Sequence, residues 1–397
     1  VNTRTALQNA VASATTRSTP ALATGLLGAV NDDQVFSSPQ TNLDLFNKAV
    51  EGLTVDQVNQ ATKAVFEGQG PLLLFSSPVP VEGGETAVTA ALEASRNTPV
   101  QARAAEAELK WPYDNFGAPA VPAARSEVAD LGATLVRFPN GTLLNIKKTD
   151  FRADQILVSA RTGLGELGLP ADTLSPLSMA STVLAPGGLG KLSLDEMNRV
   201  LSGRTYSAAV NQAGDAYIFA GATKPADLQL ELQVLAAYLT DPGLRGASFE
   251  QTKAMFPQIL AQLGATPRGV FQRDASGLLA SGDARETTPT AEQIAAIQID
   301  DIRSGVRSAL AQGPVEITVV GDVDVDAVIA AVGSTFGALP SRGEAPTPPA
   351  GSTVRKFPAP TATPVQLYHT GPAEQALGFV AWPTTDQVED RKTARQL

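Results

Sequence analysis

A long-range internal repeat is the feature that most constrains the fold of this chain. Residues 53–94 and 297–338 share one order of elements: a helix opened by an apolar-x-apolar-Asp pattern, a Gly-Pro pair, an apolar run, an acidic turn and a second helix. The prolines of the two pairs, Pro71 and Pro314, lie 243 residues apart. Solenoid repeats recur every ~20 to 50 residues, so this much longer period predicts duplicated domains.

The two copies predict the same local structures. The helix patterns start with Val55, Asp56 and Val58 in one copy and with Ile299, Asp300 and Ile302 in the other. The predicted strands are residues 72–75 and 315–320, and the helices that follow them are residues 86–92 and 326–332. A unit of 243 residues is longer than the sequence available on either side, so we expect a piece of a longer protein, cut at both ends.

Composition excludes several classes of protein. The 397 residues exceed the ~250 at which single cores stop growing, so we expect more than one domain. No apolar run reaches the ~20 residues that span a bilayer, so we expect a soluble chain with no membrane insertion. The net charge of −10 disfavours a nucleic-acid partner. The absence of cysteine excludes disulfides, thiolate metal sites and a cysteine nucleophile.

The central part of the chain predicts an α+β domain, with helices packed on a mostly antiparallel sheet. Asn140-Gly141 indicates a turn before an alternating strand, and the run "DQILVSAR" is predicted to be its antiparallel neighbour. Residues 204–222 read as two strands around Gly214. A helix with Pro225 in its first turn follows, and its apolar stripe consists of Leu228, Leu232, Leu235 and Leu239.

A G-x-G-x-x-G pattern, made by Gly163, Gly165 and Gly168, follows the strand-like run "ILVSAR". In a dinucleotide fold this loop opens a helix at once, and an acidic residue follows ~20 residues later. Here Pro170 and Ser175-Pro176 interrupt the segment, and a glycine-rich loop stands where the acidic residue belongs. We therefore predict a turn between a strand and a helix, with no phosphate bound.

Two acidic or basic motifs have simpler interpretations than a ligand site. Asp322, Asp324 and Asp326 alternate as at the start of a calcium loop, but no Gly or distal Glu follows at the required spacing. A helix pattern begins there, so we expect Asp324 or Asp326 to cap a helix. Lys147-Lys148 ends an alternating strand, where a solvated strand end is the preferred interpretation.

The remaining titratable candidates also predict no chemistry. His369 is the only histidine, so no site with two histidine ligands can form, and we expect a structural or surface role for it. The pairs of neighbouring carboxylates fall in loops or at helix starts, where acidic residues are common: Glu166 with Asp172, and Asp195 with Glu196.

Taken in order along the chain, these features resemble the insulinase/pitrilysin family of zinc metallopeptidases (inverzincin type), in the long bacterial branch with two homologous halves. The resemblance is carried by "ATLVRFPNGTLLNIKKTDFRADQILVSARTGLGELGLP", "RTYSAAVNQAGDAYIFAGA", "LAAYLTDPGLRGASFEQTKAMF" and "QLYHTGPAEQALGFVAWPTTD". It implies insulinase-like α+β units, also described as LuxS/insulinase-like, arranged as duplicated domains.

The catalytic domain of that family carries H-x-x-E-H on a helix after the Gly-rich turn, with two zinc-binding histidines and a Glu that activates water. The corresponding helix here, residues 172–186, reads "DTLSPLSMASTVLAP" and contains no His or Glu. The resemblance therefore implies an inactive domain, with no catalytic, cofactor-binding or metal-binding residue in this chain. Zinc is expected in a missing N-terminal domain of the parent protein.

The resemblance also gives the domain boundaries. Residues 1–110 are expected to be the C-terminal part of a second peptidase-like domain and residues 130–339 a complete inactive one. The Pro-rich stretches 111–129 and 340–364 are expected to be linkers, the first between the two halves. Residues 365–397 are expected to start a further domain.

The implied function is that of the non-catalytic wall and hinge of a peptide-degrading chamber in a zinc endopeptidase. The implied partners are peptide substrates and the remaining domains of the same chain, and the implied compartment is the bacterial periplasm, with the cytoplasm as the alternative. A second hypothesis is a non-catalytic subunit or scaffold of a heteromeric peptidase, with no zinc site anywhere in its chain. A third is an unrelated α+β module that binds a nucleotide at residues 163–168. An H-x-x-E-H motif upstream of Val1 would distinguish the first hypothesis from the second.

Overall fold

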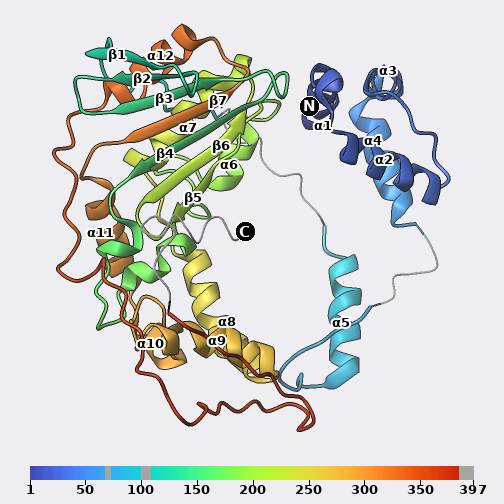
Figure 1. Ribbon diagram of the computed structural model, residues 1–397. Helices are drawn as coiled ribbons and strands as arrows, with labels where there is room; N and C mark the ends of the chain where they lie inside the picture. The colour runs from blue at the N-terminus through green and yellow to red at the C-terminus, as the bar shows by residue number, and fades with distance from the viewer. Residues whose placement is uncertain (68–72, 100–108, 384–397) are drawn as a thin grey trace.

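A seven-stranded mixed sheet dominates the computed structural model, which describes residues 1–67, 73–99 and 109–383. Figure 1 shows the sheet on one side of the molecule and helices α1 to α5 on the other. The strand order is β1-β2-β3-β7-β4-β6-β5. The bounds are β1 Ala124–Val128, β2 Ala133–Arg137, β3 Leu143–Lys148, β4 Ile156–Thr162, β5 Ala209–Gln212, β6 Tyr217–Thr223 and β7 Glu316–Gly321.

The sheet buries one face only. Along β4, Ile156, Val158 and Ala160 are buried, whereas Leu157 and Arg161 are exposed. Side chains of a strand alternate between the two faces of a sheet, so this pattern leaves the second face to solvent. The turn predicted at Asn140-Gly141 joins β2 to β3, and the Asn140 side chain accepts a hydrogen bond from the Thr142 N–H at 3.0 Å.

The prediction that β3 and β4 are neighbours is wrong, because β7 lies between them. β7 pairs with β3 in parallel and with β4 in antiparallel orientation, over six residues on each side (Figure 1). The local sequence around β3 and β4 contains no trace of a strand that follows about 150 residues later. Apart from the parallel β3–β7 ladder, the five ladders of the described residues are antiparallel. The prediction of an α+β fold with a mostly antiparallel sheet is confirmed.

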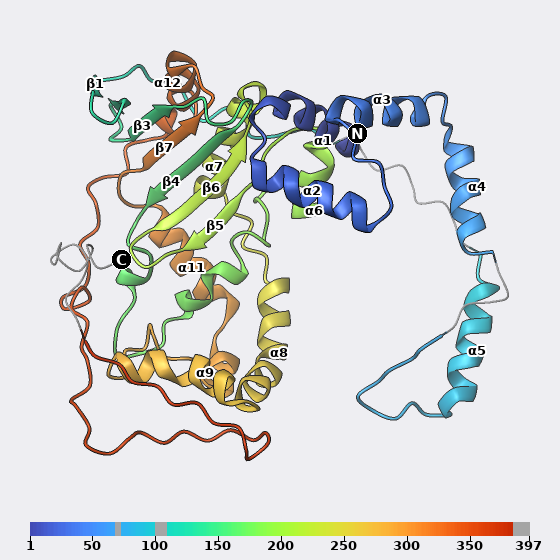
Figure 2. The same cartoon turned by 45° about the vertical axis from the view of Figure 1, so that its right-hand side comes forward.

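Helices cover the buried face of the sheet and extend beyond one end of it (Figure 2). α7 and α12 lie against the strands, and α11 packs beside the 3₁₀ helix η3. The bounds are α6 Leu194–Val200, α7 Leu228–Thr240, α8 Ala247–Gly264, α9 Pro267–Leu279, α10 Ala291–Ala296, α11 Ile299–Leu310 and α12 Val325–Gly333. Those of the 3₁₀ helices are η1 Ala14–Thr16, η2 Gly165–Gly168, η3 Pro176–Thr182, η4 Pro225–Asp227 and η5 Phe336–Ala338.

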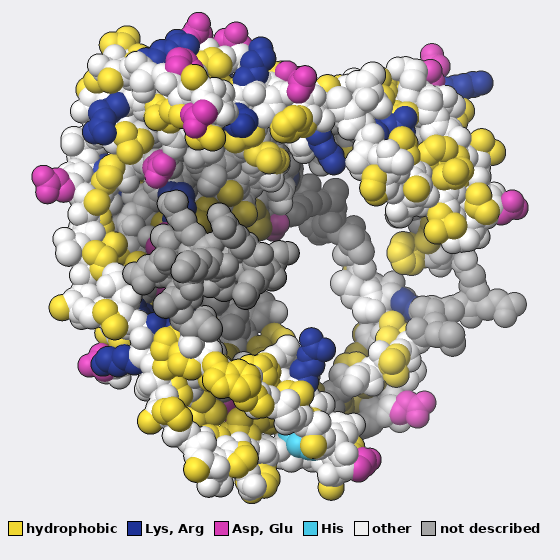
Figure 3. Space-filling view, in the orientation of Figure 1, with side chains coloured by type: hydrophobic (Ala, Val, Ile, Leu, Met, Phe, Trp, Pro, Cys, Tyr) yellow, Lys and Arg dark blue, Asp and Glu magenta, His cyan; other side chains and the backbone are white. Residues whose placement is uncertain are grey.

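The N-terminal helices form no core of their own. They are α1 Asn2–Ala12, α2 Thr19–Asn31, α3 Pro39–Val50, α4 Val55–Val65 and α5 Gly84–Arg96, and none of them has a buried residue. Hydrophobic side chains gather on the surface over this part of the molecule (Figure 3), among them Leu27, Val30, Leu45, Val65 and Phe66.

The first copy of the repeat differs from its prediction at the strand. Helices α4 and α5 lie where the pattern places them, but residues 73–75 form no strand, and Leu72 lies outside the described residues. Leu73, Leu74 and Phe75 are 55%, 92% and 56% exposed. A strand requires a neighbour for its N–H and C=O groups, and no strand of the described residues pairs with this segment.

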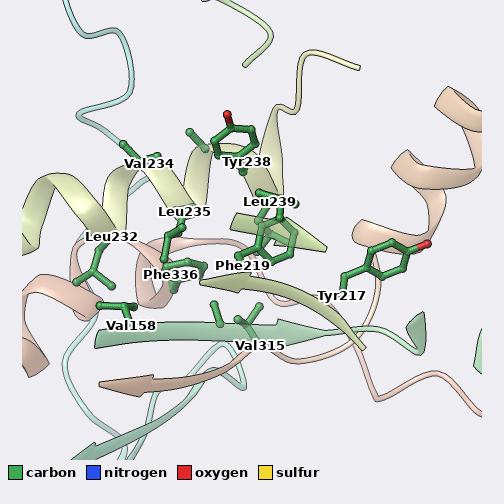
Figure 4. Close-up of a cluster of buried hydrophobic side chains, with 14 of the residues drawn as sticks. Val158, Tyr217, Phe219, Leu232, Val234, Leu235, Tyr238, Leu239, Val315 and Phe336 are labelled. Atoms are coloured by element: carbon green, nitrogen blue, oxygen red, sulfur yellow. The ribbon is translucent and has the colours of Figure 1, made fainter. Parts of the chain in front are cut away.

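The core lies between α7 and the sheet (Figure 4). Leu232, Leu235 and Leu239 of α7 point toward Phe219 and Phe336, as the predicted stripe requires. Val234 and Tyr238 lie on the opposite side of α7 and are buried as well. α7 is therefore enclosed on both sides and not only along its predicted stripe.

Both Pro-rich stretches contact the sheet domain. The Tyr113 hydroxyl donates to Asp241 Oδ2 at 2.7 Å and accepts from the Lys191 N–H at 2.9 Å. β1 itself begins inside the predicted linker 111–129. In the second stretch, Arg342 donates to the Gly313 carbonyl at 3.0 Å, and the Ser352 carbonyl accepts from Arg285. The domain boundaries themselves stay a prediction.

No helix in the described part of the chain is both long and apolar enough to cross a membrane.

Candidate functional site

The Gly-rich turn lies at the end of β4 and packs against the β5–β6 hairpin. Gly163 and Gly165 have φ angles of +69° and +56°, in the left-handed region that favours glycine. A Cβ atom at Gly165 would lie 2.0 Å from the Ala213 carbonyl oxygen. Both glycines are therefore required by the backbone path of the turn.

Two N–H groups of this turn already have partners on the β5–β6 hairpin. Glu166 N–H donates to the Ala213 carbonyl and Leu167 N–H to the Gly214 carbonyl, each at 2.9 Å. Phosphate binding at a Gly-rich loop requires free N–H groups directed at the ligand. The geometry supports the interpretation of the motif as a turn and gives no support to a nucleotide site.

The segment that corresponds to the zinc helix of the resembled family is not an α-helix. The expectation of a helix over residues 172–186 is wrong, since only the 3₁₀ helix η3, Pro176–Thr182, forms there. Ser175 caps it by accepting from the Leu177 N–H at 3.3 Å, and Pro176 removes an N–H from its first turn. Leu177 packs so closely on α11 that a Cβ at Gly305 would lie 2.8 Å from its Cδ2.

The three alternating aspartates have separate roles. Asp324 caps α12 by accepting from the Ala327 N–H at 2.8 Å, as predicted for a helix cap. Asp322 accepts from the Asp154 N–H at 2.9 Å, and Asp326 pairs with Arg125 at 2.7 Å. Since each carboxylate is directed at a different partner, the structure does not bring them together as a cation site.

The other candidates are also held by local contacts. His369 Nδ1 accepts from the Gly371 N–H at 3.1 Å, and its Nε2 lies 3.0 Å from the Gln375 carbonyl. Glu196 forms a capping box with Ser193, and the hydrogen bonds from Ser193 lower the pKa of the Glu196 carboxyl. Asp195 lies in the same first turn of α6. Lys147 and Lys148 are exposed at the end of β3.

Glu166, in η2, and Asp172, after it, lie in different surroundings. Burial raises the pKa of Glu166, and the nearby Glu286 acts in the same direction. Asp172 lines an open cavity of about 560 Å³, together with Asp301 of α11 and apolar residues that include Leu174, Pro289 and Ile297. Neither Asp172 nor Asp301 has a side-chain hydrogen bond or ion pair in the described part of the chain.

The described residues contain no group of three His, Asp or Glu side chains placed to hold a metal ion. The segment that would have to carry zinc offers no imidazole and only one carboxylate, Asp172, beside serine, threonine and methionine, so the residues present do not fit zinc.

A buried carboxyl that the sequence analysis did not single out lies in α7. Glu231 is fully buried, and burial raises its pKa to about 8. The signal for it was present in the sequence, because a Glu stands between Leu230 and Leu232 in a helix that is otherwise apolar at this point. Because the predicted stripe buries only one side of the helix, the Glu231 side chain would be expected to point to solvent.

No family model and no curated protein sequence matches this chain. Solved structures do match. The periplasmic protease PqqL from Escherichia coli aligns with 89% of this chain at 18% identity, with a TM-score of 0.55. The ferredoxin protease FusC, solved as a mutant in complex with Arabidopsis ferredoxin, aligns with 84% of the chain at 13% identity, with a TM-score of 0.51. The chain spans 39% and 37% of the length of these two structures.

These neighbours are insulinase/pitrilysin-like proteases, and the chain shares their fold. The resemblance inferred from the sequence is confirmed at the level of the fold.

Proposed function

We propose that this chain is the non-catalytic part of a zinc-dependent peptidase, where it forms wall and hinge of a chamber that encloses peptides. The observation that carries the proposal is a protease-type α+β fold whose segment after the Gly-rich turn is a 3₁₀ helix without His or Glu. A fold kept without its metal ligands supports a role in enclosing the substrate and not in hydrolysing it.

Charge supports a peptide as the ligand. The chain has a net charge of −10, and the cavity beside η3 presents two unpaired carboxylates, Asp172 and Asp301, next to apolar side chains. An extended peptide with a Lys or Arg side chain has the complementary charge and an apolar stem that can lie along Leu174 and Ile297. We therefore propose basic, extended peptides as the preferred substrates of the parent enzyme.

Location and cofactor follow the same proposal. Zinc belongs to a domain outside this sequence, and the proposed compartment is the periplasm, which is where the PqqL neighbour is described. Peptide substrates and the other domains of the same chain are the proposed partners.

The first experiment measures zinc and activity together. The chain is expected to take up no stoichiometric zinc after dialysis against the metal and to leave a fluorogenic peptide library intact. Tight uptake of one zinc per chain, together with peptide cleavage that a chelator abolishes, would refute the proposal.

The second experiment measures peptide binding by fluorescence anisotropy. A labelled Lys/Arg-rich peptide is expected to bind more tightly than an acidic peptide of the same length, and salt should weaken the binding. The double variant Asp172→Asn/Asp301→Asn should lose most of this preference, while Asp44→Asn, on the exposed helix α3, should keep it. Equal binding of both peptides by the native chain would refute the proposed substrate preference.

A further inference from the structure

The carboxyl of Glu231 is buried with one oxygen unpaired. Its Oε2 accepts from the Ser207 N–H at 3.1 Å, whereas Oε1 has no hydrogen-bond partner. A Cβ atom at Gly221 of β6 would lie 1.8 Å from Oε1, so this oxygen occupies the space that a side chain would otherwise fill. A buried polar atom without a partner is costly when charged and much less so when protonated.

In the described part of the chain, no cation forms an ion pair with Glu231. Asp227, the N-cap residue of α7, lies four residues before Glu231 and pairs with Arg204 at 2.9 Å, while Lys224 lies 3.9 Å from the same carboxylate. From the segment before β5, Tyr206 faces Glu231, and their proximity raises the pKa of the Tyr206 hydroxyl further than burial alone. Arg204 and Lys224 therefore interact with Asp227 and not with Glu231. Because its charge would be uncompensated, Glu231 is favoured in its neutral form.

The two carboxyls together hold one extended segment, residues 204–207, which we call the pad. Thr205 N–H donates to Asp227 Oδ2 at 2.9 Å, and Ser207 N–H donates to Glu231 Oε2. Residues four apart on a helix are neighbours on one face, and alternate N–H groups of an extended segment point the same way. The spacing of the two carboxyls, one at the N-cap and one in the first turn of α7, therefore matches that of the two N–H groups in the pad.

Helix α1 contacts this segment and the preceding Gly203 through polar side chains. Asn2 accepts from the Gly203 N–H at 2.9 Å, and Thr5 donates to the Gly203 carbonyl at 3.2 Å. Asn9 donates to Thr205 Oγ1 at 2.8 Å and accepts from Lys224 Nζ at 3.0 Å. Helix α1 is thus tied to the sheet domain next to the residues that the two carboxyls hold: it shares Thr205 with Asp227, two residues before the Ser207 N–H that Glu231 binds.

We propose that Glu231 is a proton-operated clamp: while it is protonated the pad stays closed over it, and when it loses its proton the cost of burying the charge exceeds the gain from the Ser207 N–H bond, so that the pad opens and α1 is released. The inference concerns the attachment of the N-terminal helices and does not depend on a peptidase activity.

The direction of the effect follows from linkage. Burial raises the pKa of Glu231 from 4.5 to about 8, against the hydrogen bond from the Ser207 N–H, which lowers it. The closed pad therefore binds a proton that the opened pad gives up. The equilibrium constant for opening the pad therefore rises by up to about tenfold per pH unit between pH 4.5 and about 8, and it no longer depends on pH above that.

Hydrogen exchange on the full chain tests the clamp. Protection factors of the pad and of α1, corrected for the intrinsic exchange rate, are expected to fall together from pH 5 to pH 8 and to level off above. In Glu231→Gln, which imitates the neutral acid, both should lose this slope. Glu250→Gln, on the exposed surface of α8, is the matched control and should retain it.

Three results would overturn the inference. If the protection factors of Glu231→Gln depended on pH as they do in the native chain, the carboxyl would not be the cause. Glu231→Met repeats this test if the Gln variant does not fold. A slope confined to the pad, with α1 protection unchanged, would break the link to the helix. The variant Asn9→Ala should leave α1 poorly protected at every pH while the pad keeps its slope, and full protection of α1 in this variant would contradict the proposed contact.

Discussion

Residues 53–96 and 297–333 carry the same order of elements in different environments. In the second segment α11, β7 and α12 are built into the core, and Ile302, Ile317 and Val328 are fully buried. In the first, α4 and α5 bury no residue, and the counterpart of Ile317, Leu74, is 92% exposed. The same apolar pattern therefore forms a strand where neighbouring strands can pair with it, as β3 and β4 do with β7, and stays irregular where none does.

The largest expected effect separates the two apolar runs directly. Ile317→Ala should lower the free energy of unfolding by about 3 to 4 kcal/mol, because it opens a cavity beneath a central strand. Leu74→Ala should change it by less than about 0.5 kcal/mol, since that side chain is exposed. Urea unfolding of both variants checks the pair. Equal losses would show that Leu74 is covered in solution.

The second prediction concerns pH and applies to the sheet domain alone. The pKa of Glu231 is raised in the folded state, so its stabilising contribution is fully present below pH 4.5 and is lost as pH rises to about 8. The native chain should lose on the order of 3 kcal/mol across this window, and Glu231→Gln should not. Unfolding at pH 5 and pH 8.5 measures the difference. An equally large loss in both proteins would assign the pH dependence to other groups.

The third prediction compares the helices that follow the two runs. Asp324 caps α12, whereas α5 starts at Gly83 without a side-chain cap. Asp324→Ala should therefore cost about 1 kcal/mol. The control Asp326→Ala removes an exposed ion pair with Arg125 and a carboxylate in the first turn of α12, but no cap, and should cost less than Asp324→Ala. If both variants lost the same amount, the cap would not be the cause.

The smallest effect belongs to the first segment. Thr54 and Gln57 form a capping box at the start of α4. Thr54→Ala should weaken α4 locally by about 0.5 to 1 kcal/mol, seen as faster amide exchange, while global unfolding stays unchanged. A shift of the global transition would mean that α4 is part of the cooperative core.

The sequence was sufficient for elements whose cause is local. The stripe of α7, the turn at Asn140, the hairpin around Gly214 and the cap at Asp324 each depend on residues close together in the chain. The place of β7 between β3 and β4 could not be predicted in this way, because the pairing joins residues about 170 apart.

The candidate site shows the same limit. The prolines after Gly163 and Gly165 were enough to predict that these glycines form a turn. The burial of the Glu231 carboxyl could not be predicted from its neighbours in the chain, because it depends on Gly221 and Ser207, which belong to other elements.

The insertion of β7 also sets the order in which the domain can be completed during synthesis. Until residues 316–321 leave the ribosome, β1-β2-β3 and β4-β6-β5 are two separate small sheets, each with an open edge. Open edges pair readily with other chains, and long-range strand pairing is slow because a large loop must close first. Nascent chains ending before β7 should therefore be the most aggregation-prone species on the way to the folded protein.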